Sequence, residues 1–196
     1  MRVLFLAPLG LFATSALAAP ITTTFSGTVS FAGPALPPVI VTGDPITGSY
    51  TFDSNTPNMS PTPLNTGVYA VTLFTATIGG FTFNSTTATL FVEAGPGEYL
   101  VSGLGTAADT INGHVLDTFG VRTTSSQITT TALPLTPPTG VYTYVMDFGL
   151  PFREGDVDGP LSVPVVVPAV SEPGTAFVFG LGLLGLIGAM SKRARG

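Results

Sequence analysis

Apolar and polar residues alternate along three stretches of the chain. In each stretch the apolar side chains share one parity, so an extended strand would turn all of them to the same face. They are Ile21, Phe25, Val29 and Phe31 in the first, Ile46, Tyr50 and Phe52 in the second, and Tyr142, Tyr144, Met146 and Phe148 in the third. This period of two predicts half-buried β-strands.

Shorter apolar runs between these stretches predict more strands. They cover residues 68–78, 81–84, 88–93, 99–104, 115–122 and 128–133, and Gly79-Gly80 predicts a hairpin turn between two of them. The proline-rich segments 33–38 and 53–63 are expected to be loops. Eight or nine strands without intervening helices predict an all-β fold, a single antiparallel β-sandwich or jelly-roll-like domain over residues 19–159.

Residues 1–18 have the composition of a secretory signal peptide. Arg2 is followed by an apolar run over residues 3–12, and Ala16 and Ala18 supply the small residues of a cleavage site. The run is too short for a membrane anchor. We therefore expect export through the Sec translocon.

The C-terminal end has three parts in a fixed order. A turn-forming motif at residues 171–175 precedes an uncharged apolar run over 176–190, and Lys192, Arg193 and Arg195 close the chain. The apolar run predicts a transmembrane helix over residues 175–191, and the cations place its C-terminal end in the cytoplasm. A buried core helix is the alternative, but glycine, which costs about 1 kcal/mol in a soluble helix, occurs four times in the run.

One motif inside this run is misleading. Gly180, Gly182 and Gly185 match the G-x-G-x-x-G fingerprint of dinucleotide-binding folds. That fingerprint needs a preceding strand and an acidic residue about 20 positions later. The chain ends too soon for this, so the match is rejected.

The tail resembles the PEP-CTERM sorting signal of Gram-negative bacteria. The resemblance rests on the GLGLLGL core, on the basic end, and on a Val-Pro-Glu-Pro-like motif in which Ser171 replaces the first proline. The residues of the motif region are Val170, Ser171, Glu172, Pro173, Gly174 and Thr175. The resemblance implies recognition and cleavage by exosortase, a membrane-embedded enzyme, and a mature form at the cell surface or in the extracellular matrix.

Residues 42–53, TGDPITGSYTFD, also resemble the N-terminal β domain of many PEP-CTERM proteins, a resemblance that implies no activity. From the residues themselves, we expect Asp44 to cap a turn before Pro45 and Asp53 to close its strand with an Asx-turn. The prolines of residues 160–170 predict an extended linker between the domain and the sorting signal at 171–196.

Without the two targeting segments, the chain is acidic. Residues 19–170 carry Arg122 and Arg153 against ten acidic residues, a net charge of −8. Such a domain repels phosphate backbones, so nucleic acid is not an expected partner. The chain has no cysteine, which excludes disulfides, thiolate metal sites and a cysteine nucleophile.

Candidate chemistry is sparse. His114 is the only histidine and follows an Asn-Gly turn, and no G-x-S-x-G elbow accompanies it. Glu154, Asp156 and Asp158 have the spacing that begins an EF-type calcium loop, but Val165 stands at the twelfth position instead of glutamate. We expect a solvated turn there, with a weak calcium site as the alternative.

A hydrolase would need two paired carboxylates. The aspartates available to it are Asp44, Asp53, Asp109, Asp117 and Asp147. The sequence leads us to expect a non-enzymatic, exported surface or matrix protein without a cofactor. The alternative is a glycan- or calcium-binding module associated with exopolysaccharide, and the hydrolase ranks last.

Overall fold

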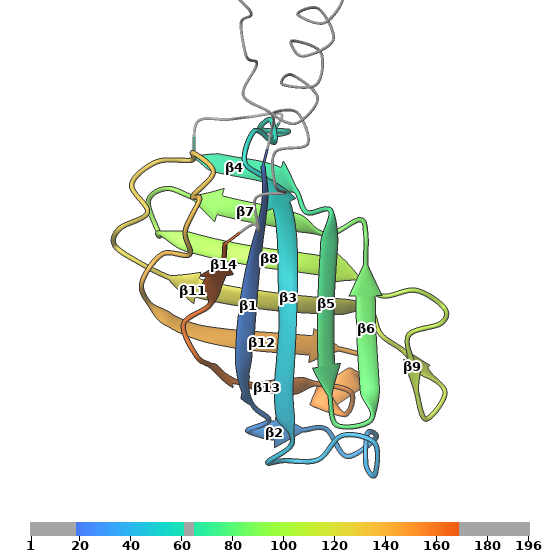
Figure 1. Cartoon of the computed structure of the whole chain (residues 1–196). Helices are drawn as coiled ribbons and strands as arrows, with labels where there is room; N and C mark the ends of the chain where they lie inside the picture. Colours follow the sequence, from blue (N-terminus) through green and yellow to red (C-terminus); the bar gives the residue numbers. More distant parts are fainter. Residues whose placement is uncertain (1–18, 61–64, 169–196) are drawn as a thin grey trace, which may run out of the picture.

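The computed structural model of the chain describes residues 19–60 and 65–168 (Figure 1). In these residues the secondary structure is β, apart from one 3-10 turn, η1, at Pro151–Arg153. The strands are β1 Pro20–Thr28, β2 Phe31–Ala32, β3 Pro45–Asp53, β4 Thr66–Ala70, β5 Leu73–Ile78, β6 Phe81–Ser85, β7 Thr89–Glu93, β8 Glu98–Leu104, β9 Thr110–Ile111, β10 His114–Val115, β11 Thr118–Thr124, β12 Val141–Asp147, β13 Val157–Leu161 and β14 Val165–Val167.

One antiparallel sheet contains nearly all of these strands. Its order is β4-β7-β8-β11-β12-β13-β1-β3-β5-β6, with β14 paired to β1 and β2 paired to β13. Figure 1 shows the sheet curled on itself as a half-barrel, so that β1, β3, β5 and β6 (the front layer) cross over β4, β7, β8, β11, β12 and β13 (the back layer). The all-β, antiparallel prediction is confirmed, and the sandwich or jelly-roll form stays a prediction.

Aromatic side chains fill the space between the layers. Phe74 of β5 stacks on Phe119 of β11 with ring centroids 4.8 Å apart, and Phe83 and Phe25 pack edge-on or tilted around this pair. All four rings are buried. Burying an aromatic side chain removes roughly 150–250 Å² from water, so this cluster is a main source of stability.

The apolar positions of the alternating stretches lie on the inner face of the sheet. In β1, β3 and β12 the predicted apolar positions Phe25, Ile46, Tyr50, Tyr144 and Met146 are buried. Gly79, with φ of 53°, forms the predicted hairpin between β5 and β6. These predictions succeed because one side of each strand faces the core and the other faces solvent.

Three predicted strands differ from the structure. Residues 68–78 form two strands because the chain leaves the back layer after β4 and enters the front layer at β5. Residues 115–122 divide between β10 and β11. Residues 128–133 form bends instead of a strand, and Thr131 accepts a hydrogen bond from the hydroxyl of Tyr69 through its carbonyl oxygen.

The segment expected to be a linker is part of the sheet as far as Val167. Pro160 and Leu161 belong to β13, and β14 pairs antiparallel with β1, placing Thr22 opposite Val167. Proline lacks a backbone N–H, but it is tolerated at sheet edges and bulges. Pro164 lies in the connection between β13 and β14, and it is buried.

Candidate functional site

The sorting and cleavage residues lie outside the described part of the chain. These are the signal-cleavage residues Ala16 and Ala18, the motif region 170–175, and the basic end with Lys192, Arg193 and Arg195. The same holds for the expected transmembrane helix. Their roles stay predictions.

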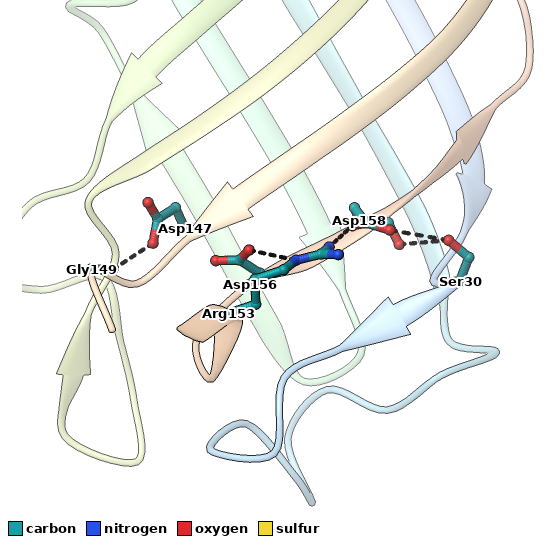
Figure 2. Close-up of polar contacts among 6 residues, drawn as sticks. All are labelled: Ser30, Asp147, Gly149, Arg153, Asp156 and Asp158. Atoms are coloured by element: carbon teal, nitrogen blue, oxygen red, sulfur yellow. Dashed lines mark hydrogen bonds and ion pairs between the residues drawn. The ribbon is translucent and has the colours of Figure 1, made fainter. Parts of the chain in front are cut away.

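In the turn where a weak calcium site was the alternative, Arg153 pairs with two aspartates (Figure 2). The guanidinium of Arg153 donates through Nε to Asp156 over 2.9 Å and pairs through Nη2 with Asp158. Ser30 donates its hydroxyl to Asp158 over 3.3 Å, and the hydrogen bond to Asp156 is the main cause that raises the pKa of Arg153. Both carboxylates are therefore paired with one arginine of the chain itself.

The turn that carries Arg153 has an unusual backbone. Phe152 and Arg153 both have left-handed conformations, with φ of 57° and 63°. Each such residue other than glycine costs about 1–3 kcal/mol. The guanidinium lies 4.4 Å from the centroid of Phe31, and this cation–π contact, with the two ion pairs, holds the turn in place. Phe152 is left 95% exposed.

In this arrangement a calcium ion would compete with Arg153 for the two carboxylates. Glu154 is exposed on the same turn, and its backbone carbonyl accepts a hydrogen bond from Ala35. Within the described ranges, no group of three or more acidic or histidine side chains is arranged to hold a metal ion. A calcium ion at Asp156 and Asp158 would first have to displace Arg153.

The aspartates considered for a hydrolase act in turns. Asp44 accepts a hydrogen bond from the N–H of Val41 over 2.9 Å, and Asp53 accepts one from Asn55 over 2.8 Å. The turn cap and the Asx-turn predicted for these two residues are thereby confirmed. Asp109 accepts from Thr106 over 2.8 Å, and Asp147 from Gly149 over 2.7 Å. The backbone N–H of Asp117 donates to the carbonyl of Asp147 over 2.7 Å.

His114 lies in a short hairpin. Asn112 and Gly113, with φ of 51° and 83°, form the two-residue turn between β9 and β10, and His114 follows half-buried. Among the described residues, its ring makes no hydrogen bond that would activate a nucleophile. The amide of Asn112 instead donates to the carbonyls of Ala35, Leu36 and Pro37.

The outer side of the front layer is covered with hydroxyl groups, and we call it the hydroxyl face. Its side chains are Thr22, Thr24, Ser26, Thr28, Thr47, Ser49, Thr51, Thr75, Thr77, Thr82 and Asn84. Several bond across strands, as Thr22 does with Thr51 over 2.9 Å. In the four strands of this layer, the only charged residue is Asp53 at the end of β3.

A shallow groove of about 540 Å³ lies on this face. Thr24, Thr47 and Thr77 line this groove, and Gly48 lies between them with its backbone. A side chain at position 48 would point inward, against the ring of Phe25. One wall is formed by Val163, in the connection between β13 and β14, and by Val165, the first residue of β14. The groove is therefore uncharged, with hydroxyl and methyl groups at its surface.

Neither this surface nor the pairing of Arg153 was predicted from the sequence. The alternating polar positions of ITTTFSGT contained the signal for the hydroxyl face, because their partners of the other parity were already assigned to the core. No comparable signal marked Phe152 and Arg153, since neither residue type favours positive φ.

Comparison with known proteins adds no relative. No family model matches the chain, and neither a curated protein nor a solved structure matches it. No helix within residues 19–60 and 65–168 is long and apolar enough to cross a membrane.

Proposed function

We propose that the chain is an exported, non-enzymatic protein of the cell surface or extracellular matrix. In this proposal residues 1–18 direct Sec export, a helix over 175–191 holds the precursor in the inner membrane, and exosortase processes the tail. The β domain faces the periplasm before release. Its curled sheet acts as a sandwich-like module whose two layers enclose the aromatic core.

The observation that carries the proposal is the order of the C-terminal parts. A turn-forming motif, a glycine- and leucine-rich run and a basic end follow one another within 26 residues. Such a tail is an address that is removed, comparable to the signal for a lipid anchor. The turn-capping roles of Asp44, Asp53, Asp109 and Asp147 also favour a structural role for these carboxylates over a catalytic one.

The test is the intact mass and location of the mature chain, in cells with and without the membrane protease. We expect wild-type cells to release a form that ends near Glu172, and protease-null cells to retain the full tail in the inner membrane. A tail that remains on the chain in both strains would contradict processing and leave an ordinary anchor.

A second candidate function is binding of a neutral glycan, and the groove on the hydroxyl face favours it. Hydroxyl groups both donate and accept hydrogen bonds, and the methyl groups of threonine and valine can contact the apolar faces of sugar rings. The absence of charge in the groove favours a neutral polymer over a uronate. The calcium half of this alternative is weaker, because Arg153 occupies the two carboxylates.

Affinity electrophoresis through gels containing a neutral polysaccharide tests the glycan candidate. We expect the mobility of the wild-type chain to fall, and the double variant Thr24→Ala, Thr77→Ala to regain mobility because it loses two groove hydroxyls. Thr143→Ala on the back layer is the matched control. Equal retardation of both variants would remove the groove from consideration.

A further inference from the structure

The front layer ends in a strand with a bare edge. β6 pairs with β5 on one side and is the last strand of the sheet. On its other side, no backbone group of residues 81–85 forms a hydrogen bond within the part of the chain that the structure describes. Figure 1 shows β6 as the outermost strand of its layer.

The opposite end of the sheet is capped. There the carbonyl of Val68 in β4 accepts a hydrogen bond from the N–H of Met59 over 2.8 Å. The N–H of Val68 donates to the side-chain oxygen of Asn58 over 2.9 Å. The loop before β4 therefore occupies one edge of the sheet, whereas no described residue bonds in a comparable way to the outer edge of β6.

The sequence of β6 also lacks the features that keep edge strands apart. Proteins protect such edges with lysine, proline, bulges or inward charges. β6 reads FTFNS, and none of these features occurs in it. The neighbouring β9–β10 hairpin bonds through Asn112 to the 35–37 loop and makes no backbone hydrogen bond to β6.

The distribution of charge favours a second copy of the chain as the occupant. Two copies of a domain with a net charge of −8 repel each other, except where they approach through uncharged surface. The front layer provides that surface, since Asp53 is the only charge in its four strands. The back layer carries Glu93, Glu98, Asp147 and Asp158 in its strands.

We propose that β6 pairs antiparallel with β6 of a second copy, joining two front layers into one continuous sheet. A twofold axis at Phe83 places Thr82 opposite Asn84 of the second copy, and both side chains lie on the exposed hydroxyl face. A threonine already lies opposite Asn84 inside the chain, where Thr75 of β5 is its cross-strand neighbour. The interface is isologous, since each copy contributes the same strand.

Cysteine cross-linking tests this pairing in the full-length chain, because the natural sequence contains no cysteine. Directly opposite residues of an antiparallel pair have Cα atoms about 4.5–5.5 Å apart, within the range of a disulfide. Two copies of Thr82 lie diagonally, about 7–8 Å apart, which is too far. Thr82→Cys mixed with Asn84→Cys is therefore expected to cross-link in detergent under mild oxidation, and more strongly than either variant alone.

The matched control is the pair Thr47→Cys and Ser49→Cys. These residues lie two strands inward on β3, in the same rows as Thr82 and Asn84. Association through the hydrophobic tail is common to both pairs and cancels in the comparison. A yield in the test mixture no greater than in the control mixture would overturn the proposal.

A second variant tests the interface without chemical modification. Thr82→Lys places a cation on each side of the paired edge, which natural edge strands use to prevent pairing. We expect its native mass, measured in the same detergent, to fall to that of a monomer while Thr47→Lys keeps the mass of the dimer. Persistence of the dimer in Thr82→Lys would overturn the assignment to β6.

Discussion

The hydroxyl of Tyr99 donates a hydrogen bond of 3.0 Å to the hydroxyl of Tyr50, between two fully buried side chains. Tyr99 belongs to β8 and Tyr50 to β3, so this bond joins the back layer to the front layer. Burial raises the pKa of Tyr50 to about 12, although the bond from Tyr99 acts in the opposite direction. The core is thus held together by polar contact as well as by apolar packing.

Alkaline pH is expected to destabilise the domain. Burial raises the pKa of all five tyrosines above the ordinary value of 10.0. The folded state therefore holds the phenolic protons more tightly than the unfolded state. For Tyr50 this contribution is complete below pH 10.0 and is lost as the pH rises through about 12. Tyrosinate absorbance should rise together with loss of β-sheet circular dichroism, and ionisation near pH 10 in a still-folded domain would contradict the buried cluster.

Tyr99→Phe is expected to lower the free energy of unfolding by about 1–3 kcal/mol. The variant keeps the ring but leaves the buried hydroxyl of Tyr50 without its donor. Urea unfolding of Tyr99→Phe, Tyr50→Phe and the double variant gives the coupling energy. The double variant should lose less than the sum of the two single variants, and strict additivity would argue against the bond.

Phe74→Ala is expected to lower the free energy of unfolding by about 3–5 kcal/mol, because the ring of Phe74 stacks on Phe119 in the centre of the core. Phe74→Leu, which leaves a smaller cavity, should cost less. The control is Phe152→Ala, which removes a ring that is 95% exposed and should change stability by no more than about 0.5 kcal/mol. Thermal unfolding of the three variants checks this order.

Asn112→Asp is expected to detach the loop that precedes β3. Asparagine donates from Nδ2 to the carbonyls of Ala35 and Pro37 over 2.8 and 3.1 Å, whereas an ionised aspartate can only accept. Aspartate tolerates the positive φ of this position, so the change isolates the side-chain contacts. Faster amide exchange around Val39 and Ile40, with about 1–3 kcal/mol lost in stability, is the expected result. Unchanged exchange would show that the three carbonyls do not depend on Asn112.

Arg153→Gln is expected to reveal calcium binding that the natural chain suppresses. The substitution frees Asp156 and Asp158 from the guanidinium, and because the ion pairs are exposed to solvent it should change the stability of the domain little. Calcium should then raise the melting temperature of the variant more than that of the wild type. Asp156→Ala on the Arg153→Gln background is the control. If calcium raises the melting temperature of the wild type by the same amount, Arg153 does not compete with calcium.

The strand pattern could be predicted where each strand has one buried side. Residues 45–53 gave the inward parity of Ile46, Tyr50 and Phe52 directly, since their neighbours face solvent. The segment 68–78 was harder, because the chain changes layers near Val71 and both parities carry apolar residues. The order of the strands depends on contacts far apart in the sequence, such as Gly27 with Leu161, which a local pattern does not contain.

The candidate site was predicted only in part. The turn roles of Asp44 and Asp53 followed from local chemistry, because an aspartate bonds to backbone groups two or three residues away. The spacing of Asp156 and Asp158 identified two neighbouring carboxylates, but the positive φ of Phe152, which turns Arg153 toward them, left no trace in the residue types. The hydroxyl groove needed the register of three strands, which the sequence does not specify.

Under the proposed function, the pairing of β14 with β1 determines how far the domain can stand from the membrane while its tail is attached. Val167 is the last paired residue, and Ser171 follows four positions later, a span of at most about 14 Å when extended. If the three residue pairs of β14 separate from β1, the free chain begins after Ser162, whose N–H donates to the carbonyl of Ser26, and it reaches about 32 Å. Under the same proposal, this short strand sets the distance between the domain and the membrane that is available to the processing protease.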